Sequence, residues 1–593
     1  MTIMKPLQRL PHMSCAQLTT RFAFLSLVLF LLLTHDELSY SNNFPYYSKG
    51  NNGNDGLILP QHDPHLASLL KVSAFDKSLY DTFHHPYNNY SCQPRKIHLS
   101  QGTNVEPDSG VVNMTLSFSL NRTQCGGSQQ TPSSSFPTAS SSNLHMVVVY
   151  GRGLFPDGRI EQRAADSEHS VHFDFTSPVT GELYQSDWIQ HVTLPNLIGG
   201  SHLYWYRISI VQQQSRHLPQ LHLPPSFRPV FLRGSLYKVG ETPTYRFRTP
   251  PLYHQPTSLA LVGDLGQTEN STKTMNRILQ AASLDQVTQI YDNMPPPVTQ
   301  LLIAGDLSYA DGVPERWDSW LELMQPLLQT LPLSSIPGNH EIECDNITHN
   351  VFVPYETQFR NPNRIADPDM EAPSDTYIDT LWHRMCNTPS QFFGHYNFGN
   401  AFYQYQHGMV HIIALNSYTS ILPGSIQHNW LAQVALPSVN RDATPWLLVM
   451  FHCPLYTTFW GHNDEINPTL MKSSIEDLLK KHQVNMVISG HDHAYLRTHP
   501  LYHDKVDSTG QSPMYWTLGA GGNREQHTKG YIHETPEEWV AKRDNDEYGY
   551  GHFFAKNKTH AHLHWMRDGT SSSEIVRDAV WIENYYFVHN STN

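Results

Sequence analysis

The chain has 593 residues, which is long enough for two or three domains and a large hydrophobic core. Its composition, 39% hydrophobic and 16% charged, is that of an ordinary globular protein. The 53 acidic residues outnumber the 39 basic ones, so the net charge is −14. This balance argues against a nucleic-acid partner, because binding a phosphate backbone requires a basic face.

The first 35 residues have the features of a targeting segment. Arg9 and Arg21 precede an apolar run over residues 22–33, which is shorter than the roughly 20 residues that a membrane-spanning helix needs. Residues 1–35 therefore predict a secretory signal. No small-x-small cleavage site follows, so an uncleaved anchor stays open, and a stable membrane span is expected only in that case.

Glycosylation and cysteine patterns agree with export. N-linked glycans are predicted at seven N-x-Ser/Thr sequons, namely Asn89, Asn113, Asn121, Asn270, Asn346, Asn557 and Asn590. Six cysteines are present, one of them inside the signal region. The other five suit an oxidising compartment as two pairs and one left over. The favoured pairings are local, Cys92 with Cys125 and Cys344 with Cys386, and Cys453 is expected to be a buried free thiol. We expect a secreted protein, with the vacuolar or lysosomal lumen as the alternative.

Two structural regions follow a leader. Residues 36–95 are predicted to be a flexible leader, because residues 41–56 are rich in Asn, Gly and Tyr without a period. Residues 96–251 carry short alternating segments with turn residues between them, which predicts a β-sandwich. These segments are 111–120, 144–150, 171–175, 188–194, 203–211 and 244–249. Residues 126–143 form a Gly/Ser/Pro/Thr stretch that predicts an exposed, disordered insert.

From residue 252 to the end, apolar strands alternate with helical segments, which predicts an α/β domain. The expected strands are 259–262, 301–304, 446–451 and 484–488, and the expected helices are 315–328, 426–436 and 468–481. A hairpin is expected over 401–416.

The α/β region places metal-competent side chains where its strands end. Asp306 and Tyr309 follow one apolar run that is closed by Gly305, and similar groups follow the other runs. The set of ligands comprises two carboxylates, a phenol, an amide oxygen and three imidazoles. It suits iron, zinc or manganese, and it does not suit a structural zinc site with thiolate ligands. The seven side chains are Asp264, Asp306, Tyr309, Asn339, His452, His491 and His493. They exceed what one ion takes from protein, and they fit two ions about 3.5–4 Å apart that share a bridging carboxylate.

In this order, the motifs G-D-x-G, G-D-x-x-Y, G-N-H-E, V-x-x-H and G-H-x-H resemble those of purple acid phosphatases. They occur at residues 263–266, 305–309, 338–341, 449–452 and 490–493. Segments 191–194, 204–208 and 245–251 resemble the family's fibronectin-like N-terminal domain, and segments 521–525, 548–552 and 557–561 resemble its plant-type members.

The resemblance implies a multidomain α+β protein. A fibronectin III-like β-sandwich over 96–251 would precede a calcineurin-like metallophosphoesterase domain over 252–593. That α/β domain would have two mixed sheets flanked by helices and a C-terminal purple acid phosphatase region.

The resemblance also implies how the seven side chains divide between two ions. A ferric ion would take Asp264, Tyr309, His493 and the bridging Asp306. A divalent ion (Zn, Mn or Fe) would take Asp306, Asn339, His452 and His491. Tyr309 is the discriminating residue, because a phenolate stabilises Fe(III) and Gly266 stands where broader metallophosphoesterases often have His.

The implied function is that of a secreted acid phosphatase that hydrolyses phosphate monoesters with a metal-bound hydroxide as nucleophile. His340 and His462 match the family's substrate-contacting histidines, and we expect them to be catalytic. Gly461 stands where plant members often have another His, so leaving-group specificity stays open. The alternatives are a phosphodiesterase or nucleotide pyrophosphatase on the same centre, and a non-catalytic surface glycoprotein. A homodimer is also left open.

Overall fold

The computed structural model describes residues 92–106, 109–125, 144–153, 161–164, 170–213, 236–283, 296–363, 396–567 and 576–588. The predicted signal, nearly all of the predicted leader and the predicted insert at 126–143 lie outside the described residues. Within those ranges, no helix is long and apolar enough to cross a membrane.

The N-terminal region forms two antiparallel sheets. Their strand orders are β1-β2-β8-β5 and β10-β9-β3-β4, with β11 paired to β9. The strands are β1 (Pro94–Gln101), β2 (Val111–Leu120), β3 (Leu144–Arg152), β4 (Glu161–Ala164), β5 (Ser170–Val171), β8 (Trp188–Ile198), β9 (Leu203–Gln213), β10 (Leu236–Glu241) and β11 (Tyr245–Arg248). The short helix α4 (Arg122–Cys125) and the hairpin of β6 (Asp174–Thr176) and β7 (Leu183–Gln185) complete the region.

These two sheets share one hydrophobic core, to which both contribute inward-facing residues such as Leu116 and Phe247. The prediction of one strand over 171–175 was wrong. Val171 belongs to β5, which pairs with β8, and Asp174 and Phe175 belong to β6, which pairs with β7, because the chain changes partners between them.

Two mixed sheets form the α/β region, as predicted. One has the order β14-β13-β12-β24-β25-β26 and the other β15-β16-β17-β18-β22-β19-β23. Their bounds are β12 (Thr257–Val262), β13 (Gln300–Ala304), β14 (Leu333–Ile336), β15 (Tyr403–His407), β16 (Val410–Ala414), β17 (Trp446–Met450), β18 (Met486–Ser489), β19 (Tyr495–Thr498), β22 (Met514–Leu518), β23 (Val540–Asp544), β24 (Gly549–Ala555), β25 (His560–Arg567) and β26 (Val576–Glu583). A two-stranded ladder of β20 (Leu501–Tyr502) and β21 (Lys505–Val506) is separate from both.

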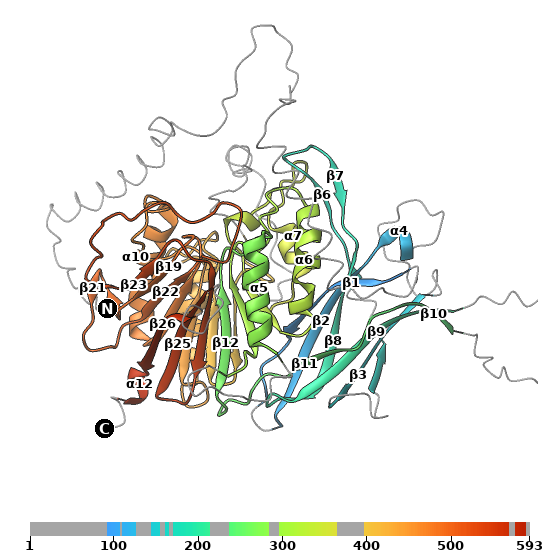
Figure 1. Cartoon of the computed structure of the whole chain (residues 1–593), viewed down its shortest axis with the longest axis horizontal. Helices are drawn as coiled ribbons and strands as arrows, with labels where there is room; N and C mark the ends of the chain where they lie inside the picture. The colour runs from blue at the N-terminus through green and yellow to red at the C-terminus, as the bar shows by residue number, and fades with distance from the viewer. Residues whose placement is uncertain are drawn as a thin grey trace, which may run out of the picture. The chain divides into compact units, whose positions relative to one another are not determined.

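Helices flank these sheets. They are α5 (Glu269–Ala281), α6 (Glu315–Leu328), α7 (Val353–Gln358), α9 (Ile426–Trp430), α10 (Ile466–Lys481) and α12 (Tyr585–Val588). The predicted helix 426–436 continues beyond α9 as a π turn and a 3-10 turn. In Figure 1, α5 lies beside β12 and α6 lies beside α5, and side chains from both helices join the core of the sheets.

The parallel strands β12, β13, β17 and β18 are buried along their whole lengths, which explains why each consists mainly of apolar residues. Their carboxyl ends meet at one edge, where Gly263 N–H donates to Leu518 O across the two sheets at 2.8 Å.

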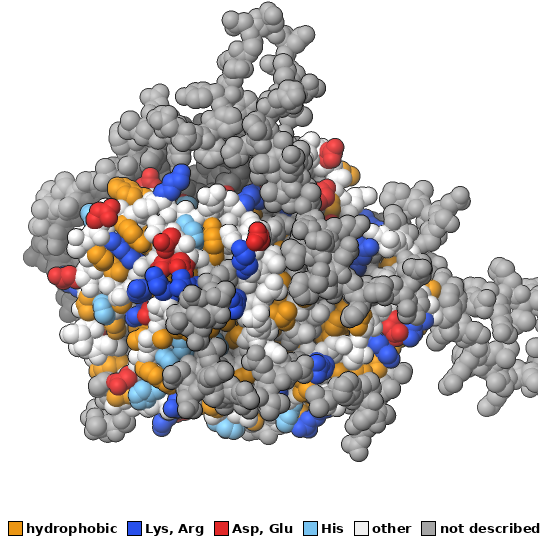
Figure 2. Space-filling model, in the orientation of Figure 1, with side chains coloured by type: hydrophobic (Ala, Val, Ile, Leu, Met, Phe, Trp, Pro, Cys, Tyr) orange, Lys and Arg blue, Asp and Glu red, His pale blue; other side chains and the backbone are white. Residues whose placement is uncertain are grey.

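Polar contacts join the N-terminal sheets to the α/β region. Lys96 on β1 is buried and contacts Asp187 at 3.0 Å and Asp318 of α6 at 2.5 Å. Tyr206 of β9 donates its hydroxyl hydrogen to Gln329 O at 2.8 Å. On the surface that Figure 2 draws, Lys and Arg side chains are scattered among acidic and apolar ones.

The cysteine predictions are partly confirmed. Cys92 and Cys125 form a disulfide, and Cys453 is a buried free thiol. Cys344 is disulfide-bonded as well, while its predicted partner Cys386 lies outside the described residues.

Candidate metal centre

The loops that carry the predicted ligands have unusual backbone conformations. Asp264, Asp306, Tyr309 and His491 have positive φ angles of 56°, 54°, 55° and 70°. Non-glycine residues adopt this left-handed region at a cost of about 1–3 kcal/mol each, and such strain clusters at functional sites. Four of the seven predicted ligands share it.

Close approach of the loops explains one glycine of the G-N-H-E motif. A Cβ atom at Gly338 would lie 2.0 Å from Asp306 Oδ1. The same motif supplies Glu341, a fully buried carboxylate that accepts N–H hydrogens from Asp306, Leu307 and Gly338 at 2.8–2.9 Å. Glu341 therefore ties the loop after β13 to the loop after β14, a role that its sequence position did not reveal.

One group of predicted ligands gathers around the Tyr309 phenol. Tyr309 Oη lies 3.2 Å from Asp264 Oδ1 and 3.0 Å from His493 Nε2. His493 Nε2 and Asp264 Oδ1 are 3.4 Å apart. Hard oxygen donors dominate this group, which suits a highly charged cation.

A second group gathers around the His452 imidazole. His452 Nε2 lies 3.1 Å from Asn339 Oδ1 and 3.1 Å from His491 Nδ1. Asp306 Oδ2 is 3.2 Å from the same nitrogen. Asp306 lies within 4.8 Å of ligand atoms of both groups, since it clusters with His452 and His491 and also with Asp264 and His493. The structure thus brings all seven predicted side chains together, with Asp306 between the two groups.

The outward ring nitrogen of each histidine meets a hydrogen-bond acceptor. His452 Nδ1 is 2.7 Å from Ala304 O, His493 Nδ1 is 2.9 Å from Gln526 O, and His491 Nε2 is 2.8 Å from Glu465 Oε2. An outward N–H donated to each acceptor leaves the inward nitrogen of a neutral ring with a lone pair. The inward nitrogens of His452 and His493 therefore face oxygen atoms, and that of His491 faces His452 Nε2 in the buried centre.

Lone pairs that converge in this way require a positive charge between them, and the donor set fits a pair of metal ions. The pKa shifts point the same way. Burial lowers the pKa of His452, but Asp306 and Asp264 outweigh it and raise that pKa to about 9. Burial raises the pKa of Asp306, but His452 and His340 outweigh it and lower that pKa. The centre thus favours anionic carboxylates around a cation.

Both predicted catalytic histidines border this centre. His340 is buried, its ring lies 4.0 Å from the Tyr309 ring, and its Nε2 is 3.7 Å from Asp306 Oδ2. The His462 ring stacks on the His491 ring at 3.8 Å.

Three further supporting residues, which contact the histidines or their partners, were not predicted from the sequence. Glu465 contacts both His462 Nδ1, at 2.7 Å, and His491. Asp311 accepts from His340 Nδ1 at 2.5 Å, and Arg524 contacts Asp311. Asp311 and Arg524 lie within or beside quoted motifs, but their roles depend on contacts between distant segments.

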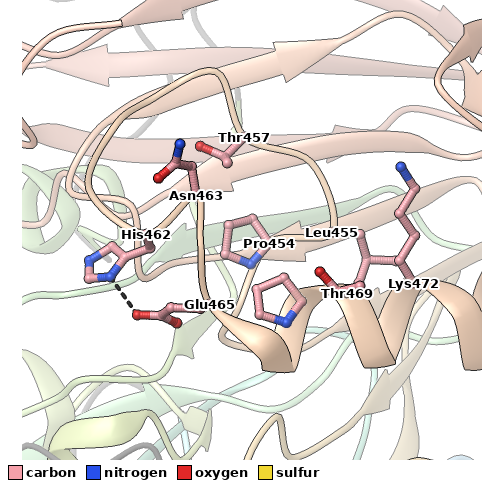
Figure 3. A pocket seen from close by; sticks show the side chains of 9 residues that line it. Pro454, Leu455, Thr457, His462, Asn463, Glu465, Thr469 and Lys472 are labelled. Atoms are coloured by element: carbon pink, nitrogen blue, oxygen red, sulfur yellow. Dashed lines mark hydrogen bonds and ion pairs between the residues drawn. The ribbon is translucent and has the colours of Figure 1, made fainter. Parts of the chain in front are cut away.

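A pocket of about 240 Å³ shares His462 and Glu465 with the centre. It lies between the loop after β17 and the first turns of α10, as Figure 3 shows. Its lining combines Pro454, Leu455 and Pro468 with the polar side chains of Thr457, Asn463, Thr469 and Lys472.

Comparison with known proteins identifies the family. The model of the calcineurin-like phosphoesterases matches residues 257–495, and that of the iron/zinc purple acid phosphatase-like protein C matches residues 512–578. The chain is 33% identical over 350 residues to the probable purple acid phosphatase 20 of Arabidopsis thaliana, which covers 58% of this chain and 70% of that relative. This chain belongs to the purple acid phosphatase family.

Two further comparisons agree. The phosphoenolpyruvate phosphatase of Allium cepa is 29% identical over 373 residues, which is 60% of this chain and 68% of that protein. The structure of purple acid phosphatase PPD1 from yellow lupin (Lupinus luteus) superimposes with a TM-score of 0.60 and 17% identity, over 84% of this chain and 75% of that one. That structure supports the shared α/β fold. The chain is thus a phosphatase of the metallophosphoesterase fold, and its family hydrolyses phosphoesters at a binuclear metal centre.

Proposed function

We propose that this phosphatase is a secreted acid phosphatase that hydrolyses phosphate monoesters at an Fe(III)–M(II) pair. Asp264, Tyr309 and His493 would hold the ferric ion, and Asn339, His452 and His491 would hold a divalent zinc, manganese or iron ion. Asp306 would bridge the two. The observation that carries the proposal is that the inward ring nitrogen of each histidine faces an oxygen or nitrogen atom of another proposed ligand at 3.0–3.1 Å.

When bound, the two cations neutralise phosphate oxygens and lower the pKa of attacking water. Residues of the chain itself then protonate the leaving group. The P–O bond to the leaving oxygen breaks, that oxygen takes a proton from a histidine, and water supplies the new P–O oxygen. The proton that this water releases passes to solvent, from which the histidine regains its own. His340 Nε2 and the His462 imidazole are the proposed donors, because both border the centre.

Metal analysis and two substrates test this proposal. The purified full-length protein should contain about one iron and one further divalent ion. It should hydrolyse 4-nitrophenyl phosphate much faster than bis(4-nitrophenyl) phosphate. A preference for the diester would favour the phosphodiesterase alternative. Metal-free protein without activity would favour a non-catalytic glycoprotein.

For the N-terminal region, we propose that residues 96–251 are a fibronectin III-like sandwich that precedes a catalytic domain over 252–593. Support comes from two antiparallel sheets that share one core. Limited proteolysis should cut first within 126–143 and the leader, and it should spare both sheet regions. Early cleavage inside a described strand would contradict this division.

We also propose that the protein is exported from the cell. Two of the predicted sequons, Asn346 and Asn557, are exposed, and the Cys92–Cys125 disulfide fits an oxidising compartment. Glycosidase treatment should lower the mass of the protein from culture medium. N-terminal sequencing would separate a cleaved signal from an anchor. Sedimentation analysis would decide the possible homodimer.

A further inference from the structure

The segment 521–525 lies against the metal-binding loop that follows β12. Asn523 Nδ2 donates to Asp264 O at 3.1 Å, and a Cβ at Gly266 would lie 2.9 Å from Asn523 Cα. This contact fixes the position of the next residue, Arg524, whose side chain is 21% exposed. The proposed ligands do not include Arg524, so its place beside them needs another explanation.

The Arg524 guanidinium bridges two points near the centre. Its Nη1 donates to Tyr309 O at 2.6 Å, and its Nη2 contacts Asp311 Oδ2. The guanidinium carbon also lies 5.6 Å over the Tyr309 ring. A planar guanidinium holds such a pair of acceptors in one geometry, which a lysine ammonium does not.

Asp311, held by Arg524, in turn fixes the orientation of the His340 ring. Its other oxygen, Oδ1, lies 2.5 Å from His340 Nδ1, so the ring donates the Nδ1 hydrogen to Asp311. Nε2 is then the nitrogen that faces the centre, 3.7 Å from Asp306 Oδ2 and 3.7 Å from Glu525 Oε1. Asp311 has a positive φ of 52°, so its backbone is strained as well.

We infer that Arg524 is a positioning residue for protonation of the leaving group, acting through Asp311 on His340. The inference rests on the proposed role of His340. As the P–O bond breaks, the leaving oxygen takes the proton from Nε2, while Nδ1 keeps its own hydrogen, which stays hydrogen-bonded to Asp311. Without Arg524, Asp311 loses its second partner, and the His340 ring no longer has a single orientation.

Leaving-group basicity gives a readout that a purely structural role would not affect. A strongly basic alkoxide needs the proton, whereas 4-nitrophenolate leaves readily without it. Arg524→Met should therefore lower kcat on glycerol 2-phosphate by about 10-fold or more, and kcat on 4-nitrophenyl phosphate by less than about 3-fold. Asp311→Asn should show the same pattern. KM for both substrates and the metal content should stay close to those of the unchanged protein.

Three further variants complete the experiment. Arg497→Met breaks a matched, part-buried Arg–Asp pair with Asp578, away from the centre, and should leave the ratio of the two kcat values unchanged. Arg524→Lys keeps the charge without the planar fork, so the ratio of its two kcat values should be intermediate. It replaces Arg524→Met in the comparison if that variant does not fold. His340→Ala tests the proposed donor itself.

The outcomes separate the two proposals. Equal losses on both substrates, no loss, or loss of metal in the Arg524 variants would overturn the positioning role, provided that His340→Ala shows the leaving-group dependence. If His340→Ala lacks that dependence, the donor role of His340 fails, and the inference fails with it.

Discussion

Buried histidines occur in two regions of this phosphatase with opposite surroundings. At the strand ends, His452 lies among Asp306 and Asp264, which raise its pKa to about 9 against the opposing effect of burial. Inside the sheets, His407 has only neutral partners, Gln101 Oε1 and Thr299 Oγ1, each at 2.9 Å, and burial lowers its pKa to about 3. The surroundings of His452 therefore stabilise a positive charge, whereas those of His407 exclude one.

The difference comes from the loops at the carboxyl ends of the strands. These loops supply carboxylates and accept backbone strain, whereas the strands around His407 supply neutral polar contacts. A cation can be held at the strand ends for this reason.

Removing the shared carboxylate should have the largest effect. Asp306→Ala deletes the only proposed ligand common to both groups, so both metals should be lost together. Activity should fall by roughly 10³-fold or more. Metal analysis after gel filtration measures this. Asp578→Ala, a carboxylate paired with Arg497 elsewhere, is the control and should keep both metals. Full metal content in Asp306→Ala would rule out the bridging assignment.

Glu465 should affect only one half of the centre. Its carboxylate accepts from His491 Nε2 at 2.8 Å, and burial, which raises its pKa, is outweighed by His491 and His462, which lower it. Glu465→Gln should weaken the divalent ion by about 10–100-fold, as outer-shell partners usually do. Titration of the metal-depleted protein with Zn²⁺ measures this. Equal weakening of iron retention would show that the two halves are not independent.

Tyr309 should change the colour more than the rate. If its phenolate binds Fe(III), the protein should be pink to violet, and Tyr309→Phe should abolish the visible band. We expect activity to fall less than about tenfold, since the phenol does not contact the reacting oxygen. Tyr418→Phe also removes a buried phenol, one that donates to Asn339 Oδ1 at 3.2 Å, and it should keep the band. A colourless, fully metallated and active unchanged protein would defeat the ferric assignment and leave the two-metal hydrolase intact.

Much of the α/β region and all of the proposed ligands could be predicted from local patterns. An apolar run closed by glycine, as at Leu301–Gly305, signals both the buried strand and the loop after it. The supporting residues could not be found in this way. Glu465 meets His491 across 26 residues and Arg524 meets Asp311 across 213 residues, so only the folded chain reveals these contacts.

Some strands were also not predicted from the sequence. β1 and β10 were not predicted, although β1 carries Lys96, which meets Asp187 and Asp318 across three segments. The sequence of strand β25 alternates histidines with apolar residues over residues 560–565, and this signal could have been recognised. The order of strands within each sheet depends on long-range pairing, which no local pattern encodes.

The smallest expected effect concerns the neutral histidines of the sheets. His407 is fully buried with a pKa of about 3, against about 6.5 in an unfolded chain. Between these values the unfolded state binds more protons, so the free energy of unfolding rises with pH. The contribution is fully present above pH 6.5 and is lost as pH falls toward 3. At pH 5, His407 should cost about 2 kcal/mol relative to neutral pH. His407→Gln keeps a polar side chain that does not titrate, so its stability should fall less between pH 7 and pH 5, even though it is lower at pH 7. Guanidinium unfolding at both pH values, with metals present throughout, measures the difference.

The exposed His533→Gln is the matched control and should retain the full pH dependence. Identical pH dependence in His407→Gln and the unchanged protein would show that the sheet interior does not exclude the charge, and the contrast between the two regions would then rest on the metal centre alone.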